Sequence, residues 1–211
     1  MRKHRILLSV ATLLAIFVCA GFTISNDEIQ RLAKVLGWRT GQTIADVGAG
    51  EGEIGFAAAR IVGASGKVYL TELDPKKLAA LEADAKERKS GNVEVLAAAE
   101  KETRLPVNCC DVIVLRRVYH HFTAPKEMDA SLLQSLKPGG SLAVTDFPPR
   151  KWLTQNEPVK GVPSNRGGHG IPKKVLVDEL TAAGFIVEKT IDDWPDDDYL
   201  VIFRKPTPGM N

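Results

Sequence analysis

The stretch from Ile44 to Gly55 constrains the fold more than any other part of the chain. An apolar run ends in Asp46, glycines then occupy positions 48, 50 and 52, and a helical pattern follows. This succession predicts a strand, a tight turn and a helix. Glycine suits the turn because it accepts a positive φ and lets a ligand approach the main chain closely. The helix, expected from Glu53, would point free N–H groups at the same place. The stretch therefore predicts a ligand-binding turn.

Two acidic residues narrow the kind of ligand that this turn could bind. Glu51 and Glu53 flank the last glycine and would repel a pyrophosphate. The alternating glycines also differ from the G-x-G-x-x-G pattern that binds dinucleotides. The turn therefore favours a cationic ligand without phosphate.

Apolar runs and helical stripes alternate along the rest of the chain. We expect strands at 43–46, 67–72, 93–97, 112–115, 141–145, 185–190 and 199–204. Helices are expected from about 26 to 36, at 53–62, and at about 75–89, 125–136 and 172–183. Such alternation is typical of an α/β fold, a doubly wound and mostly parallel sheet with helices on both faces. The acidic segment 192–198 would then form a solvated hairpin tip.

Four segments in order resemble the motifs of the class I S-adenosylmethionine-dependent methyltransferases. They are D-x-G-x-G-x-G at 46–52, T-E-L-D-P at 71–75, Y-H-H-F at 119–122 and S-L-K-P-G-G at 135–140. The resemblance covers roughly residues 27 to 205 and is greatest to the small-molecule, type 11-like branch. It implies a Rossmann-like seven-stranded sheet with an antiparallel last strand. It also implies S-adenosylmethionine as cofactor and direct methyl transfer to a small molecule.

The resemblance also assigns residues to cofactor binding. Glu72, at the end of the second strand, would accept two hydrogen bonds from the ribose diol; the alternative is a helix-capping acid, a role for which Asp74 is better placed. Asp46 would order the glycine turn and face the ammonium group of the cofactor or a water molecule. The full expected set is Asp46, Gly48, Ala49, Gly50, Gly52, Glu72, Leu73, Ala98, Ala99, Glu100 and Arg116.

Two features beside this set leave alternatives open. The family usually has an acid at the end of the third strand that contacts adenine, but this chain has three alanines there, so Glu100 or a backbone group would substitute. Arg116 or Arg117 would pair with the methionine carboxylate of the cofactor, or else form salt bridges with Glu100 or Glu102.

The segment Tyr119-His120-His121 contains the candidate catalytic residues, His121 and Tyr119. Methyl transfer from a sulfonium is a direct displacement, so a base is needed only if the nucleophile must lose a proton. Adjacent histidines point apart, so at most one should face the pocket; a capping and core role for His121 is the alternative. We expect no metal, because the chain has only four histidines and no spaced cluster.

The loop from Phe147 to Gly170 would determine the substrate. It carries Phe147, Trp152, Arg166 and His169, which would contact the substrate if the loop folds over the pocket as a lid. The alternative is a solvated surface loop. Cys110, in the neighbouring Cys109-Cys110 pair, is interpreted as a small core residue.

The first residues resemble a targeting segment. A basic head precedes an apolar run from Ile6 that ends in small residues, which predicts a cleaved secretory signal or an uncleaved membrane anchor through 6–24. The domain would then be exported (periplasmic or secreted) or membrane-anchored. The predicted division is a leader at 1–24, the methyltransferase domain at 25–205 and a tail at 206–211.

The net charge of the chain indicates which class of partner it could bind. The formal net charge is +2, and Arg2, Lys3 and Arg5 carry three of the positive charges, which leaves −1 for the rest. Without a basic excess a nucleic-acid partner is not expected.

Two other functions are alternatives to the methyltransferase. One is a non-catalytic module that binds S-adenosylmethionine or its demethylated product, and the other is a nicotinamide-dependent oxidoreductase. The sequence does not predict the oligomeric state.

Overall fold

The computed structural model describes residues 24–150 and 160–209. Residues 1–23, most of the expected leader, lie outside the described part, so export or anchoring stays a prediction. Within the described residues, no helix is long and apolar enough to cross a membrane.

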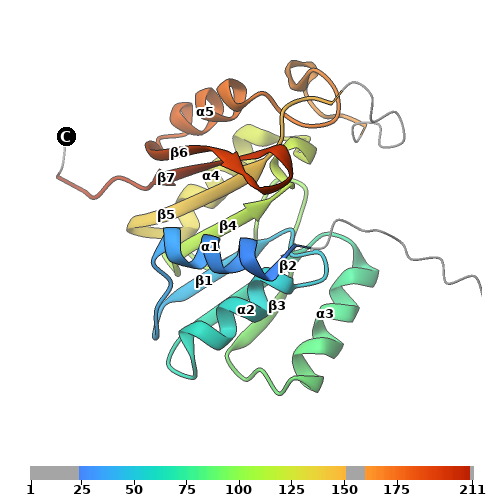
Figure 1. Ribbon diagram of the computed structural model, residues 1–211, viewed down its shortest axis with the longest axis vertical. Helices are drawn as coiled ribbons and strands as arrows, with labels where there is room; N and C mark the ends of the chain where they lie inside the picture. Colours follow the sequence, from blue (N-terminus) through green and yellow to red (C-terminus); the bar gives the residue numbers. More distant parts are fainter. Residues whose placement is uncertain (1–23, 151–159, 210–211) are drawn as a thin grey trace, which may run out of the picture.

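Seven strands form one sheet in the order β3-β2-β1-β4-β5-β7-β6 (Figure 1). The strands are β1 (Thr43–Val47), β2 (Lys67–Glu72), β3 (Val93–Ala97), β4 (Cys110–Arg116), β5 (Leu136–Asp146), β6 (Ile186–Trp194) and β7 (Asp198–Arg204). The first five strands pair in parallel, and β7 runs antiparallel to both β5 and β6. The predicted fold, a mostly parallel sheet with an antiparallel last strand, is confirmed. The order reverses between β1 and β4, which is where open sheets of this kind bind ligands.

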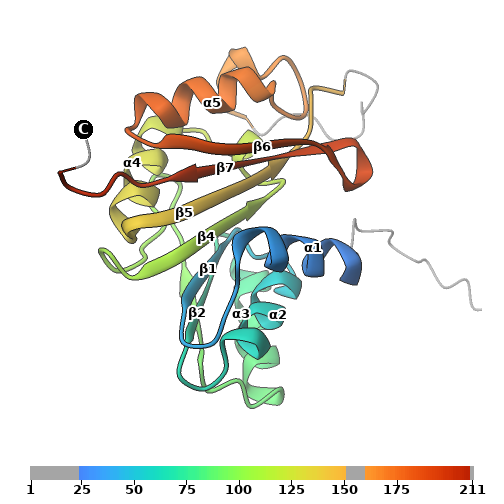
Figure 2. The same cartoon turned by 60° about the vertical axis from the view of Figure 1, so that its left-hand side comes forward.

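Helices cover both faces of the sheet (Figure 2). They are α1 (Asn26–Leu36), α2 (Glu53–Val62), α3 (Pro75–Glu87), α4 (Pro125–Ser135) and α5 (Lys173–Ala182). Along β1, Ile44 belongs to the apolar core under α1, α2 and α3, whereas Ala45 belongs to the core under α4 and α5. Successive side chains of a strand point to opposite faces, so this alternation divides the core into two layers.

Local signals fix several helix ends where the sequence predicts them. Ser25 accepts a hydrogen bond from the backbone N–H of Glu28, and Gly37 ends α1 in the left-handed conformation. Asp74 accepts from the N–H of Lys76 at 2.7 Å and caps α3. The main boundary difference is β5, which begins at Leu136 rather than at 141, because Leu136 pairs with Cys110 across an irregularity in the ladder.

The acidic segment before β7 is not merely a solvated tip, which corrects the prediction. Asp198 is buried and binds the Arg117 guanidinium through both oxygens, at 2.7 and 3.0 Å. Asp193 pairs with Arg31 on α1. The acidic segment therefore pairs with basic side chains from several other parts of the fold, among them Arg150 and Lys173.

Glu28 joins three elements that are far apart in the sequence. Its side chain is 3% exposed, and its two oxygens accept from Arg116 Nε at 3.0 Å and Nη2 at 3.1 Å. Oε1 also accepts from the Trp194 indole N–H at 3.0 Å. The carboxylate therefore connects α1 to the end of β4 and to the end of β6.

Replacing Glu28 should destabilise the fold strongly. In Glu28→Ala, Arg116 loses a buried bidentate partner and Trp194 loses its acceptor, so we expect the free energy of unfolding to fall by about 3 kcal/mol in urea denaturation. Asp27→Ala is the matched control, because Asp27 is exposed in the same helical turn; its loss should be about 0.5 kcal/mol. Equal losses in the two variants would contradict this role of Glu28.

Candidate functional site

The glycine turn after β1 requires its glycines for steric reasons. Gly48 and Gly52 have φ values of +72° and +76°, and a Cβ on Gly48 would lie 2.6 Å from a methyl carbon of Val118. A Cβ on Gly52 would lie 2.7 Å from Leu81 and from Phe56. The turn can therefore follow this path only without side chains at these positions.

Asp46, at the end of β1, holds the first turn of α2. Its Oδ2 accepts from the N–H of Gly55 at 3.0 Å, and its side chain is buried. Burial raises the pKa of Asp46 to about 7, the Gly55 N–H opposes this shift, and the nearby Glu72 adds to it. The carboxyl group therefore titrates near neutrality.

Glu72 ties the end of β2 to the glycine turn. Its Oε1 accepts from the N–H groups of Leu73 at 2.7 Å and Asp74 at 3.0 Å, and its Oε2 accepts from the N–H of Gly50 at 3.0 Å. The residue is 9% exposed. A carboxylate offers about four acceptor positions, so these bonds leave one for a ligand.

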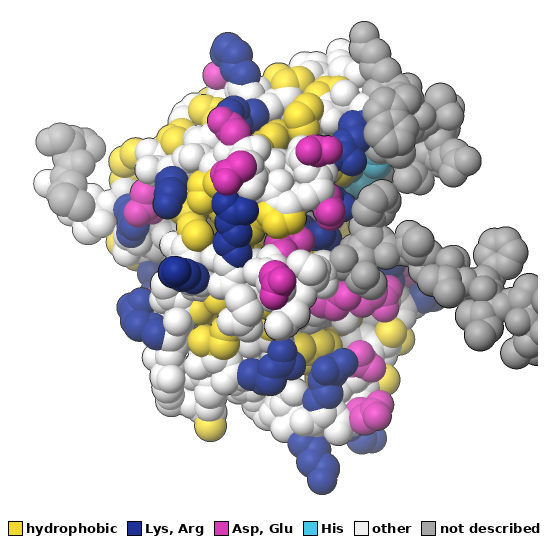
Figure 3. Space-filling model, in the orientation of Figure 1, with side chains coloured by type: hydrophobic (Ala, Val, Ile, Leu, Met, Phe, Trp, Pro, Cys, Tyr) yellow, Lys and Arg dark blue, Asp and Glu magenta, His cyan; other side chains and the backbone are white. Residues whose placement is uncertain are grey.

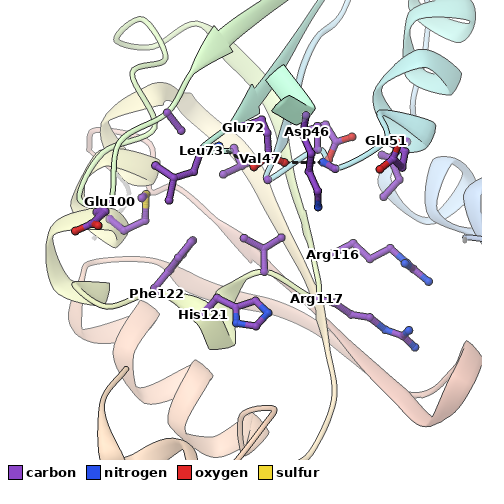
Figure 4. A pocket seen from close by; sticks show the side chains of 18 of the residues that line it. Asp46, Val47, Glu51, Glu72, Leu73, Glu100, Arg116, Arg117, His121 and Phe122 are labelled. Carbon is purple, nitrogen blue, oxygen red and sulfur yellow. Dashed lines mark hydrogen bonds between the residues drawn. The ribbon is translucent and has the colours of Figure 1, made fainter. Parts of the chain in front are cut away.

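A cavity of about 570 Å³ opens between the glycine turn and the segment after β4. Figure 4 shows Glu72 and Leu73 on one side and His121 and Phe122 on the opposite side. The lining residues are Ile24, Asp46, Val47, Gly48, Ala49, Gly50, Glu51, Glu53, Ile54, Glu72, Leu73, Lys77, Ala98, Ala99, Glu100, Arg116, Arg117, Val118, His121, Phe122, Thr123 and Met128. The cavity thus has an acidic wall, a basic corner and an apolar wall.

The structure brings all but one of the expected cofactor-binding residues to this cavity. The exception is Gly52, the N-cap residue of α2, which is not among the lining residues. At the end of β3, the N–H groups of Ala98 and Ala99 are already bonded to the carbonyls of Glu72 and Glu102. An amino group needs an acceptor, so the Glu100 carboxylate or a backbone carbonyl of this segment could substitute for the missing acid.

Arg116 and Arg117 line the cavity but have other partners than the predicted salt bridges. Arg116 binds Glu28 and Arg117 binds Asp198, whereas Glu102 pairs with Arg104. The alternative of salt bridges to Glu100 or Glu102 is therefore corrected. The actual partners lie on α1 and β7, which are far from β4 along the chain.

Tyr119 is not in the cavity, which corrects the prediction of a catalytic role. It is fully buried, and its hydroxyl lies 3.0 Å from Asp129 Oδ2 and 3.0 Å from Glu179 Oε2. A hydroxyl has one proton to donate, so it donates to one carboxylate and accepts from the other in its protonated form. Burial raises the pKa of Asp129 to about 7, which fits a proton held here.

Only one of the two adjacent histidines lines the cavity, as the sequence predicts, but their rings do not point apart: the ring centroids lie 3.9 Å from each other. His121 lines the cavity, whereas His120 is buried and its Nδ1 lies 2.8 Å from Asp146 Oδ1. His169 packs against both, with ring centroids 4.8 Å from His120 and 5.5 Å from His121. Burial and the neighbouring imidazoles lower the pKa of His121 to about 4, so this ring is neutral at pH 7.

Among the described residues, the predicted lid residues Phe147, Arg166 and His169 do not line the cavity. Phe147 is buried against the His120 ring, and Arg166 is 1% exposed and pairs with Glu179 at 2.7 Å. His169 belongs to the histidine cluster, and Trp152 lies outside the described residues. Phe147 and Arg166 are therefore buried and not placed to contact a substrate, which corrects the prediction for these two, whereas the half-buried His169 packs beside His120 and His121. Among the described residues, no group of three His, Cys, Asp or Glu is placed to hold a metal ion.

Several lining residues were not predicted. They are Ile24, Val47, Ile54, Lys77, Val118, Thr123 and Met128. Ile24, assigned to the leader, is 8% exposed in the structure. Most of these residues are apolar and occur in sequence patterns that also fit core residues. Only their position around the glycine turn in the folded protein distinguishes them from core residues.

Comparisons with known proteins agree with this geometry. A family model described as a methyltransferase domain matches residues 39–181. The ubiquinone/menaquinone biosynthesis C-methyltransferase UbiE of Stutzerimonas stutzeri is 31% identical over 140 residues, which are 62% of this chain and 55% of that protein. The chain thus spans about half the length of the curated relatives that it matches.

Solved structures share the fold. A SAM-dependent methyltransferase from Aquifex aeolicus has a TM-score of 0.69 and 24% identity, over 84% of this chain and 89% of that one. Phosphoethanolamine N-methyltransferase 2 of Haemonchus contortus, in complex with S-adenosyl-L-methionine, has a TM-score of 0.67 and 18% identity, over 86% and 53% of the two chains.

The titration of Asp46 should change stability with pH. Because its pKa rises from 3.8 to about 7 on folding, its favourable contribution is full below pH 4 and is lost as the pH rises through 7. Asp46→Asn keeps an acceptor for Gly55 but does not ionise. We therefore expect the stability of the variant relative to wild type to increase from pH 5 to pH 8, by up to about 1.4 kcal/mol per pH unit.

Chemical denaturation of both proteins at several pH values measures this difference, in which the other titrating groups cancel. A difference that stays constant from pH 5 to pH 8 would contradict the raised pKa.

Proposed function

The chain belongs to the class I S-adenosylmethionine-dependent methyltransferases, and on that premise we propose that it transfers a methyl group to a small molecule with an ionisable hydroxyl group. The observation that carries this proposal is the cavity, in which a carboxylate fixed by the glycine turn faces an apolar wall that contains a neutral histidine.

The lining residues fit S-adenosylmethionine, the cofactor of this family. Glu72 is held by three backbone N–H groups and keeps an acceptor position for a ribose hydroxyl. Glu51, Glu53 and Asp46 make one wall acidic, which suits a ligand carrying a sulfonium and an ammonium group. Arg116 lines the cavity beside Arg117, and its guanidinium group could also hold the carboxylate of the cofactor.

The cofactor and the protein have different roles in methyl transfer. S-adenosylmethionine, when bound, supplies a methyl group on a positively charged sulfur. The protein has to bind this group and align the nucleophile, because displacement at a sulfonium needs little proton transfer. Asp46 in its ionised form would stabilise the positive charge, and the apolar wall of Val118, Phe122 and Met128 would exclude water from the reacting atoms.

His121 would orient the acceptor. Its neutral imidazole can accept a hydrogen bond from a hydroxyl of the substrate, but its low pKa makes it a weak base at pH 7. We therefore assign His121 the role of holding the hydroxyl in line. As the bond from oxygen to the methyl carbon forms and the bond from the methyl carbon to sulfur breaks, the hydroxyl proton would pass through the imidazole to water. A phenol or reduced quinone suits this arrangement, because its ring can pack on the apolar wall while its hydroxyl faces His121.

Two further observations support a small acceptor of this class. The curated relatives are C-methyltransferases of ubiquinone and menaquinone biosynthesis, although the chain spans only part of their length. On the face shown in Figure 3, basic and acidic side chains are interspersed rather than gathered into a basic patch. This distribution gives a nucleic-acid substrate no support on that face.

The nicotinamide-dependent alternative is disfavoured by the same site. The acids Glu51 and Glu53 stand at the start of α2, where a dinucleotide would place its pyrophosphate. The non-catalytic alternative shares the cofactor site and differs only in the absence of turnover, so an activity measurement distinguishes it.

The activity test uses a labelled methyl group on S-adenosylmethionine and a panel of short-chain phenols and reduced quinones. We expect a methylated product with at least one acceptor. In His121→Asn the turnover should fall by about a hundredfold, because the acceptor loses its alignment, while cofactor affinity stays within about twofold. His169→Asn is the matched control: this ring lies outside the cavity, so most activity should remain.

The pH profile of turnover gives a second readout on His121. Since its pKa is near 4, it should contribute no inflection between pH 5.5 and pH 8. Cofactor binding without product from any acceptor would favour the non-catalytic alternative. Equal losses in the His121 and His169 variants would contradict the role of His121.

A further inference from the structure

Cys109 and Cys110 lie at the amino end of β4, the opposite end of the strand from Arg116 and the cavity. Cys109 is partly exposed, whereas Cys110 is fully buried in the core under α4 and α5. Both thiols are free. Neither contributes to the site described above, so the pair is not explained by the proposed function.

The two sulfur atoms face each other. Their Sγ–Sγ distance is 2.7 Å, within hydrogen-bonding reach for sulfur. Because Cys110 is buried, a reagent in solution reaches only the sulfur of Cys109. The thiol of Cys110 can then react only with whatever is attached to Cys109.

The pKa values of the two thiols are shifted in opposite directions. The hydrogen bond with Cys110 lowers the pKa of Cys109, and the Lys137 ammonium group also favours the Cys109 thiolate, whereas burial and Asp111 oppose the shift. The same hydrogen bond and burial raise the pKa of Cys110 well above its ordinary value. Lys137 is held beside the pair by a 2.8 Å contact with Asp111. A partly exposed thiol with a lowered pKa next to a buried thiol with a raised pKa is the arrangement of an attacking and a resolving cysteine.

We propose that Cys109 and Cys110 are a reversible oxidation site for low-molecular-weight disulfides, with Cys109 as the attacking and Cys110 as the resolving thiol.

The reaction is a thiol–disulfide exchange in two steps. The Cys109 thiolate attacks one sulfur of the small disulfide, a mixed disulfide forms on Cys109, and the first small thiolate leaves. The Cys110 sulfur then attacks Cys109 Sγ and displaces the second small thiolate, which takes up the Cys110 proton and carries it out to solvent. The protein thiols are oxidised to one disulfide, and the small disulfide is reduced to two thiols.

The product would be easy to reduce again. Adjacent Cα atoms are about 3.8 Å apart, whereas ordinary disulfides join Cα atoms about 4.4–6.8 Å apart. A bond between neighbouring residues is therefore strained, and strained disulfides have more oxidising potentials. The site thus suits reversible oxidation rather than permanent stabilisation of the fold.

The test uses the full chain with Cys19→Ser, so that Cys109 and Cys110 are the only cysteines. The native protein is treated with dithiobisnitrobenzoate, a disulfide whose released thiolate is coloured, and its intact mass is measured. We expect two coloured thiolates per chain and a product without adduct, lighter than the reduced chain by two hydrogens. Dithiothreitol should restore the reduced mass.

Two variants in the same background separate the roles. Cys110→Ala should release one thiolate and keep a stable adduct on Cys109, and Cys109→Ala should not react while folded. Peptide mapping of the oxidised parent chain should find Cys109 joined to Cys110, a readout that does not depend on the variants folding. A lasting adduct on the parent chain, two adducts, a disulfide between chains, or no reaction would each overturn the proposal.

Discussion

The site depends on one carboxylate that accepts three backbone hydrogen bonds. Glu72 binds the N–H groups of Leu73 and Asp74 beyond its own strand and that of Gly50 in the turn after β1. Hydrogen bonds to a carboxylate are stronger than those between neutral groups, so they fix both the turn and the acid. The part of the acidic wall that Glu72 forms is therefore held in place by the backbone.

The opposite side of the cavity is braced by two arginines with buried or partly buried partners. Arg116 binds Glu28 from α1, and Arg117 binds Asp198 at the start of β7. Removing one partner of such a pair lowers the free energy of unfolding by more than the intact pair contributes to it. The reason is that the remaining charge stays buried without a partner. The helix before the sheet and the last hairpin thus determine where the segment carrying His121 lies.

The parts of this site that local chemistry dictates could be predicted from the sequence. The glycine turn, Glu72 at the end of β2, and the Asp74 cap all follow from residues within a few positions of one another. The partners of Arg116 and Arg117 could not be predicted, since they depend on packing between elements more than seventy residues apart. The same holds for the loop after β5: His169 and Arg166 resembled substrate contacts, but tertiary packing buries Arg166 and places His169 beside His120 and His121. Tyr119 was misinterpreted because a buried tyrosine and a catalytic one have the same sequence pattern.

The central claim is that the cavity between the glycine turn and His121 binds S-adenosylmethionine through Glu72. Calorimetric titration with S-adenosylhomocysteine, its demethylated form, tests this most directly, with NADH as a second ligand. We predict one-to-one binding to the wild-type protein, no heat with NADH, and binding about tenfold weaker in Glu72→Gln, which loses the charge on the acceptor. Thermal unfolding of the variant shows whether its fold is kept. Equal affinity in a folded Glu72→Gln, or tight binding of NADH, would contradict the account.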